Sequence, residues 1–186
     1  MIWTPGQVWG PELLAPATIQ AIKDALLPAQ VMGLTAWAEA RSRYVPGKGW
    51  VENPLDAQAD IVNIVMNRAA DPRWQARGPK GVCLQRWQFS CWEPAGGPDD
   101  PKDADTLAEN FEALLERAQR LLKGDHSDKV GNCVALAEGA LAGQLLDSLQ
   151  NACHYFADWL APPAWAHPPA VETVARYGHR FWAHVK

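Results

Sequence analysis

Several features that mark common functional classes are missing from this chain of 186 residues. The N-terminus has no basic segment followed by an apolar run, and no apolar stretch approaches the ~20 residues of a membrane span, so we expect neither a signal peptide nor stable membrane insertion. Basic residues do not cluster and the net charge is −4, which argues against a nucleic-acid partner. The sequence therefore predicts a protein that is made soluble in the cytoplasm.

Metal-binding patterns are missing as well. The five histidines form no HExxH pair and the four cysteines form no CxxC pair, so we predict neither a metal site nor another cofactor. Free buried thiols are the expected state in a reducing compartment. If disulfides form after release, Cys83–Cys91 and Cys133–Cys153 are the first candidates, although four cysteines allow three connectivities.

Tryptophan, by contrast, is abundant, with ten in the chain. Burial in the core is the usual fate of a large aromatic side chain, and it is the first interpretation for any single one of them. Ten are many for a core alone, however. Flat aromatic faces also stack on the apolar faces of sugar rings, so the count favours a protein that binds glycans. Nothing in the sequence indicates an oligomer, and we expect a monomer.

Helical periodicity is the clearest structural signal in the sequence. The third expected helix follows Asn53 as its N-cap and ends at Asp71-Pro72. Ser127 is the expected cap of the last one, and Gly124 is a natural residue to follow the helix before it. Helices are predicted over Thr18–Leu27, Ala29–Arg41, Pro54–Ala70, Ala104–Lys123 and from Ser127 to about Gly143.

The remaining segments contain more glycine, proline and aromatic residues. We expect a loop over Tyr44–Asn53, and another over Arg73–Pro101 with short extended pieces around Val82–Trp92. Alternation across Val171–Val185, with Gly178 between two arms, predicts a small hairpin. No linker divides the chain. The expected fold is a single catalytic domain over residues 1–186, mainly α (α+β), with a small β element near the C-terminus.

Glu39 is the strongest candidate for a chemical role. It lies near the end of the second expected helix and shares a face with Met32, Thr35 and Ala36. A carboxyl group beside apolar surface holds its proton more tightly, which is what a general acid for glycosidic cleavage requires. Taken alone, a glutamate at a helix end is more often a solvated surface residue.

A series of short blocks resembles the SleB-type cell-wall hydrolase family, the catalytic domain of spore cortex-lytic enzymes. The blocks occur in the family's order from about residue 31 to 182, with an insertion at about 93–129. Three departures are Cys153 for the usual Thr, Trp182 for the usual Tyr, and a shorter Gly178–His179 spacing. The blocks are Ala38-Glu39-Ala40-Arg41, Gln58 to Arg68, Gln88-Phe89-Ser90, Asn151 to Phe156, Pro163 to Ala166 and Gly178 to Trp182.

The resemblance implies a lysozyme-like fold related to lytic transglycosylases, with Glu39 as the catalytic acid and base. Gln88, Phe89 and Ser90 would line the groove beside Glu39. His154 and Tyr155 would face the glycan near the scissile bond, and Trp165 would also bind substrate. Without the resemblance, His154 and Tyr155 are an ordinary core pair. Whatever the function, we expect Arg68 to form an ion pair at the end of its helix.

A second carboxylate, which most glycoside hydrolases use, has no clear candidate here. Asp56 is explained by helix capping, and Glu52 and Asp60 by solvation. Lytic transglycosylases, by family resemblance, need only one glutamate. It protonates the glycosidic oxygen and then deprotonates the muramoyl 6-hydroxyl, which closes a 1,6-anhydro ring. The sequence thus favours a lytic transglycosylase that cleaves the MurNAc-GlcNAc strand, with a hydrolytic muramidase as the alternative.

The compact single domain also suggests a phage endolysin of a Gram-negative host, which a holin would release to the cell wall. Two other functions stay open. A zinc-dependent wall amidase or peptidase would lose activity on chelation and recover it with zinc. A non-catalytic wall-binding module, supported by the tryptophan count, would bind peptidoglycan without releasing soluble product.

Overall fold

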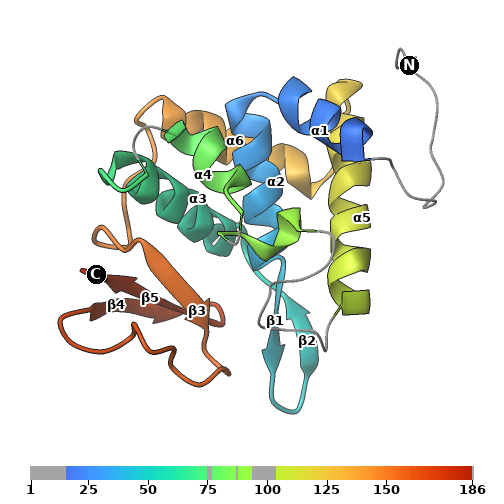
Figure 1. The fold of residues 1–186 in the computed structure, drawn as a ribbon. Helices are drawn as coiled ribbons and strands as arrows, with labels where there is room; N and C mark the ends of the chain where they lie inside the picture. Colours follow the sequence, from blue (N-terminus) through green and yellow to red (C-terminus); the bar gives the residue numbers. More distant parts are fainter. Residues whose placement is uncertain (1–15, 75–76, 87, 94–103, 186) are drawn as a thin grey trace.

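The computed structural model describes residues 16–74, 77–86, 88–93 and 104–185, with the side chains of residues 16–17 and 104–110 left aside. Helices dominate, and two small sheets complete the fold (Figure 1). The expected mainly α, α+β class is therefore confirmed. The elements in chain order are α1 (Pro16–Ala25), α2 (Pro28–Ala40), β1 (Ser42–Val45), β2 (Gly49–Glu52), α3 (Leu55–Ala70), α4 (Gly78–Leu84), the 3-10 helix η2 (Ser90–Trp92), α5 (Ala104–Leu122), α6 (Lys129–Leu141), β3 (His154–Ala157), β4 (Val171–Arg176) and β5 (His179–Ala183).

Helix α2 lies at the centre of the helical part, where it contacts α3, α4, α5 and α6. Its residues from Val31 to Trp37 are all buried, because neighbouring helices cover every side of this stretch. At Gly33 an added Cβ would lie 2.7 Å from the backbone nitrogen of Val134. The glycine therefore allows α2 and α6 to pack backbone to backbone, which fixes the direction in which α2 ends.

All five helices expected from periodicity are present, each within about two residues of its expected bounds. Two of the expected N-caps, Asn53 and Ser127, are wrong. The N-cap of α3 is Pro54, because the Asn53 side chain is used elsewhere: it accepts from Arg43 at 2.6 Å and donates to the carbonyl of Tyr177. The N-cap of α6 is Asp128, whose carboxylate accepts from the Val130 amide. Gly124 follows α5 with a positive φ, as expected.

Two segments expected to be loops contain regular structure. Residues 42–52 form the β1–β2 hairpin, in which Pro46 to Lys48 make the turn and Tyr44 pairs with Trp50. Residues 78–84 form α4 and residues 90–92 form η2, where short extended pieces were expected. Both elements are short and pack against longer helices, so tertiary contacts override the weak local pattern.

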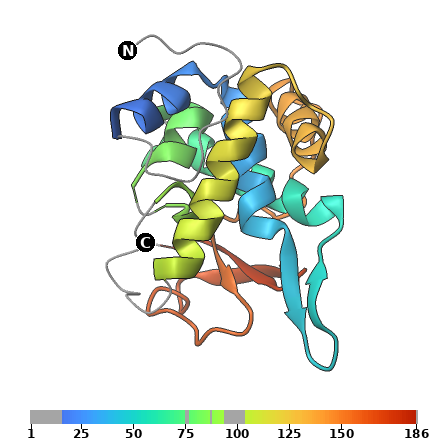
Figure 2. The same cartoon turned by 90° about the vertical axis from the view of Figure 1, so that its right-hand side faces the viewer.

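The C-terminal hairpin is confirmed as β4–β5, and β3 joins it to make an antiparallel sheet in the order β3-β5-β4. The buried carboxylate of Asp60 on α3 pairs with Arg176 on β4, which ties this sheet to the helical part. Both sheets lie at the same end of the helical part (Figures 1 and 2). The C-terminal end of α2 points toward that end.

The four cysteines carry no disulfide in the described part of the chain. Cys83, Cys91 and Cys133 are free and buried, and Cys153 is free and half-buried, so the expectation of free thiols is met and neither candidate disulfide is formed. Among the helices of these residues, none is long and apolar enough to cross a membrane.

Candidate active site

Three groups from two distant segments converge on the carboxyl group of Glu39, at the C-terminal end of α2. The hydroxyl of Tyr155, on β3, donates to Oε2 at 2.8 Å. The backbone N–H of Cys91, in η2, donates to Oε1 at 3.2 Å, and the Ser90 hydroxyl lies 3.5 Å from the same oxygen. Glu39 is half-buried and Ser90 is exposed, so the carboxyl is reached from solvent on the Ser90 side.

A buried hydrogen bond one helical turn before Glu39 sets the position of η2. The indole N–H of Trp92 donates to Thr35 Oγ1 at 2.8 Å, and this hydroxyl donates to the Val31 carbonyl. Thr35 and Glu39 are four residues apart and therefore share one face of α2. Two neighbouring residues of η2 therefore donate to this face of α2: the Trp92 indole to Thr35 and the Cys91 amide to Glu39.

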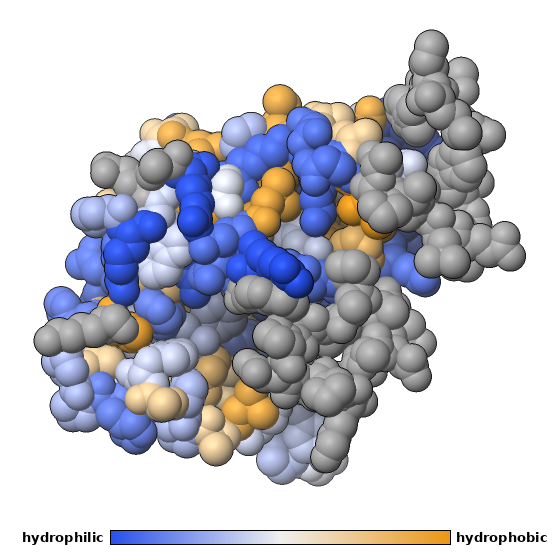
Figure 3. Space-filling model, in the orientation of Figure 1, coloured by the Kyte–Doolittle hydropathy of each residue, from blue (hydrophilic) through white to orange (hydrophobic). Residues whose placement is uncertain are grey.

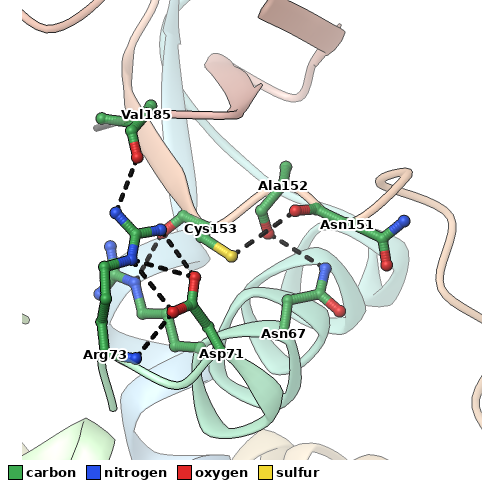
Figure 4. Close-up of polar contacts among 8 residues, drawn as sticks. Asn67, Asp71, Arg73, Asn151, Ala152, Cys153 and Val185 are labelled. Atoms are coloured by element: carbon green, nitrogen blue, oxygen red, sulfur yellow. Dashed lines mark hydrogen bonds and ion pairs between the residues drawn. The ribbon is translucent and has the colours of Figure 1, made fainter. Parts of the chain in front are cut away.

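Strand β3, which carries Tyr155, is held by the end of α3. Asn67 donates to the carbonyl of Ala152 at 3.0 Å, and Arg68 donates to the carbonyl of Cys153 at 2.7 Å. Just beyond the helix, Arg73 binds Asp71 and donates to the carbonyl of Val185, so the segment that follows β5 is held at the same point (Figure 4). These contacts fix the residues immediately before Tyr155.

Arg68 differs from the expectation of an ion pair. Among the described residues it has no carboxylate partner within ion-pair distance, and its guanidinium instead lies over the rings of Phe89 and Trp74. Burial lowers its pKa from the usual value. The guanidinium is buried close to the site, where it interacts electrostatically with both Tyr155 and Glu39.

The groups around Glu39 are held in their protonated or neutral forms. Burial, reinforced by the Glu39 carboxylate, raises the pKa of the Tyr155 phenol well above its usual value, so the phenol remains a donor. The same causes raise the pKa of the Cys91 thiol, and a thiol that stays protonated is a poor nucleophile. Burial lowers the pKa of His179, whose ring packs against Tyr155.

The structure brings together only part of the expected site. Phe89 is buried and packs against Tyr155, so it forms the floor under the site instead of a groove wall. Gln88 is half-buried in the turn before η2, where its amide donates to the Gln85 carbonyl. The backbone amide of Cys91 was missed, because a main-chain donor has no sequence signature.

His154 and Trp165 lie on the other face of the C-terminal sheet. Successive residues of a strand point to opposite faces, so His154 is directed away from the side on which Tyr155 meets Glu39. Its ring packs between Trp74, at 5.8 Å, and Trp165, at 5.2 Å between ring centroids. Burial lowers the pKa of His154 to about 4. A role for either residue in substrate binding stays a prediction.

Of the three candidates for a second carboxylate, two form ion pairs and the third is exposed at the start of α3. Asp60 is buried and bound by Arg176, and Glu52 is exposed and paired with Lys129. Asp56 is exposed in the first turn of α3. Within the described ranges, no group of three or more His, Cys, Asp or Glu side chains is arranged to hold a metal ion.

Comparison with known families places this site in context. A family model described as Cell Wall Hydrolase matches residues 52–183, more than half of the chain. The chain belongs to this cell wall hydrolase family. It is therefore an enzyme of the wall, and its substrate is peptidoglycan. No curated protein and no solved structure matches the chain.

The match in this cell wall hydrolase covers most of the site but not its central residue. Gln88 to Trp92 and all of the C-terminal sheet lie inside the matched residues, whereas Glu39 precedes them. The family thus establishes the class of enzyme. The role of Glu39 depends on the three donors that converge on its carboxyl group.

Proposed function

We propose that the protein is a glycosidase that cleaves the MurNAc-GlcNAc strand of peptidoglycan, with Glu39 as its single catalytic acid and base. The observation that carries the proposal is the convergence of the Tyr155 hydroxyl and the Cys91 amide on the two oxygens of the Glu39 carboxyl. A general acid needs a fixed direction toward the leaving oxygen, and two donors from separate segments provide it.

The reaction begins when Glu39 transfers its proton to the glycosidic oxygen, so that the bond to the muramoyl C1 breaks and the GlcNAc part leaves. The carboxylate that results is stabilised by the Tyr155 hydroxyl and the Cys91 amide, which donate to it without giving up their protons. Glu39 then removes the proton of the muramoyl 6-hydroxyl, and this oxygen closes on C1. The proton is back on Glu39 at the end of the cycle.

Two of the three earlier candidates for a second carboxylate, Glu52 and Asp60, are engaged in ion pairs, which favours this intramolecular closure over attack by water. A hydrolytic muramidase is the second candidate, because Asp158, an exposed acid on the turn after β3, acts electrostatically on His179 beside Tyr155. The proposed fold relation is to lysozymes and lytic transglycosylases, in one catalytic domain. The biological role that we propose is that of a phage endolysin, released to the wall by a holin and active as a monomer.

The experiment that tests glycan cleavage is a digest of purified peptidoglycan followed by mass spectrometry of the soluble products. New ends on the glycan strand, with intact stem peptides, are the expected result. Free stem peptides with uncut strands would show an amidase or peptidase, and bound protein without soluble product would show a wall-binding module. Either result would overturn the proposal.

A further inference from the structure

Apart from the Glu39 site, the surface carries a group of exposed aromatic rings at the β1–β2 hairpin and the loop after β3. Trp50 is 65% exposed, Tyr44 53% and Trp159 52%. Trp50 lies 6.0 Å from each of the other two rings, measured between centroids. These three residues are called the aromatic patch below. Because more than half of each side chain is exposed, burial in the core does not explain these three aromatic residues.

The ring geometry leaves flat surfaces available. Trp50 and Trp159 meet at 90°, edge to face, and Trp50 and Tyr44 meet at 73°. An edge-to-face contact covers one face of only one of the two rings. The exposed Leu160 follows Trp159. Figure 3 shows hydrophilic and hydrophobic residues interspersed on the face that it presents, with hydrophobic spots both over the helical part and over the lower, C-terminal part.

The two segments that carry the patch are packed against each other and joined by hydrogen bonds. Gly178, at the β4–β5 turn, accepts from the Asp158 amide at 2.9 Å, just before Trp159. An added Cβ at Gly178 would lie 2.9 Å from the Arg43 Cβ and 3.5 Å from the Trp159 ring. The glycine thus lets the β1–β2 hairpin and the loop after β3 close on each other. The Arg43–Asn53–Tyr177 hydrogen bonds hold the same junction.

Both parts of the patch are continuous with the Glu39 site. Strand β1, which carries Tyr44, begins directly after α2, the helix that ends with Glu39. Trp159 is four residues beyond Tyr155, which at ~3.3 Å per residue places it no more than about 13 Å along the chain from the residue that binds Glu39. A polymer of sugar rings that passes Glu39 can therefore reach the patch.

We infer that the aromatic patch is a glycan subsite, where Trp50 and Trp159 stack on sugar rings of the strand that is cut at Glu39. This inference rests on the proposed function. Sugar rings fit because they offer apolar faces to indole and polar edges to solvent, so they bind an aromatic surface that stays half exposed. The patch positions the strand and takes no part in proton transfer.

The test uses the full chain with Glu39→Gln, so that binding to purified insoluble peptidoglycan is measured without cleavage. In that background Trp50→Ala and Trp159→Ala should each weaken binding by about tenfold, which corresponds to ~1.4 kcal/mol. Trp50→Phe should restore most of it, and Leu146→Ala, at a still more exposed apolar position away from the patch, should change nothing. With Glu39 intact, the two alanine variants should raise KM and leave kcat close to wild type.

Unchanged wall binding by both alanine variants would overturn the inference. A change in oligomeric state by sedimentation, with wall binding intact, would also overturn it, since the patch would then be a contact between copies of the chain. Failure of the proposed function is separately visible: Glu39→Gln alone would still release soluble glycan, whatever the tryptophan variants do.

Discussion

The indole N–H of Trp92 donates to Thr35 Oγ1 at 2.8 Å, in a buried position one helical turn before Glu39. This one bond joins the central helix to η2, the segment whose backbone amide meets the Glu39 carboxyl. The threonine hydroxyl both accepts and donates here, because it also donates to the Val31 carbonyl. The geometry of the site is therefore linked to the stability of the core beneath it.

Thr35→Val should lower the free energy of unfolding by ~1–3 kcal/mol, because the Trp92 indole N–H is left buried without an acceptor. It should also reduce wall lysis, since η2 loses its attachment to α2. Urea unfolding of Thr35→Val, Trp92→Phe and the double variant measures the coupling, expected at ~0.5–3 kcal/mol. Additive effects of the two substitutions would show that the bond contributes nothing.

Glu39→Gln should keep the fold and lower the rate of wall lysis by ~10²–10⁴-fold, the range typical of a lost general acid. The amide keeps the shape of the side chain but cannot deliver a proton. Glu138→Gln, at an exposed position on α6, is the matched control and should clear wall suspensions at the wild-type rate. Near-normal clearance by a folded Glu39→Gln protein would remove Glu39 from the mechanism.

Tyr155→Phe should lower kcat by roughly 10–100-fold, which is the effect of losing ~1.5–3 kcal/mol from a hydrogen bond to a charged group. KM should stay close to wild type, because the phenol acts through Glu39 and not on the substrate's distant rings. Steady-state kinetics on soluble glycan fragments measure the two constants, with Tyr177→Phe at the β4–β5 turn as control. A rise in KM alone would assign Tyr155 to substrate binding.

Much of the fold could be predicted from the sequence because its helices have long apolar stripes. In α5, for example, apolar residues recur at every turn up to Gly124, so the sequence predicts both that the segment is a helix and where the helix ends. The β1–β2 hairpin was missed because strands of four residues give little periodicity, and the same holds for η2. Their conformation comes from what they pack against.

The site was only partly predictable for a related reason. Glu39 and Tyr155 could be singled out as residues, but their meeting depends on β3, which was not expected as a strand. Once β3 is known, the alternation of its side chains separates His154 from Tyr155. The tie between Asn67 and the Ala152 carbonyl could not be read from the sequence, because one of its partners is a main-chain atom.

Stability should fall as pH falls from about 6.5 to about 4, in part because of His154. Burial lowers the pKa of His154 to about 4 in the folded protein, against about 6.5 in the unfolded chain. Between these values the unfolded state binds a proton that the folded state does not, so acid favours unfolding. Buried His179, with a pKa shifted in the same direction, adds to the effect.

His154→Phe should therefore weaken this pH dependence without abolishing it, since the phenyl ring can still pack between Trp74 and Trp165. Urea unfolding at pH 7 and pH 4.5 gives the comparison, with His167→Phe at an exposed position as control. An identical loss of stability in His154→Phe and wild type would show that other groups carry the effect.

The products should end in 1,6-anhydro-muramic residues and not in reducing muramic acid. A hydrolase needs a carboxylate to activate water, at ~5–5.5 Å from the acid for retention or ~6.5–9.5 Å for inversion. Asp60 and Glu52 are engaged by Arg176 and Lys129, so neither is free for that task. The muramoyl 6-hydroxyl is already held close to C1, and such proximity can contribute ~7–11 kcal/mol.

Digestion in ¹⁸O-labelled water checks the outcome: label at a reducing muramic end would establish hydrolysis. In that case Asp158→Asn should abolish labelling, whereas under ring closure the same substitution should leave the anhydro products and their rate close to wild type.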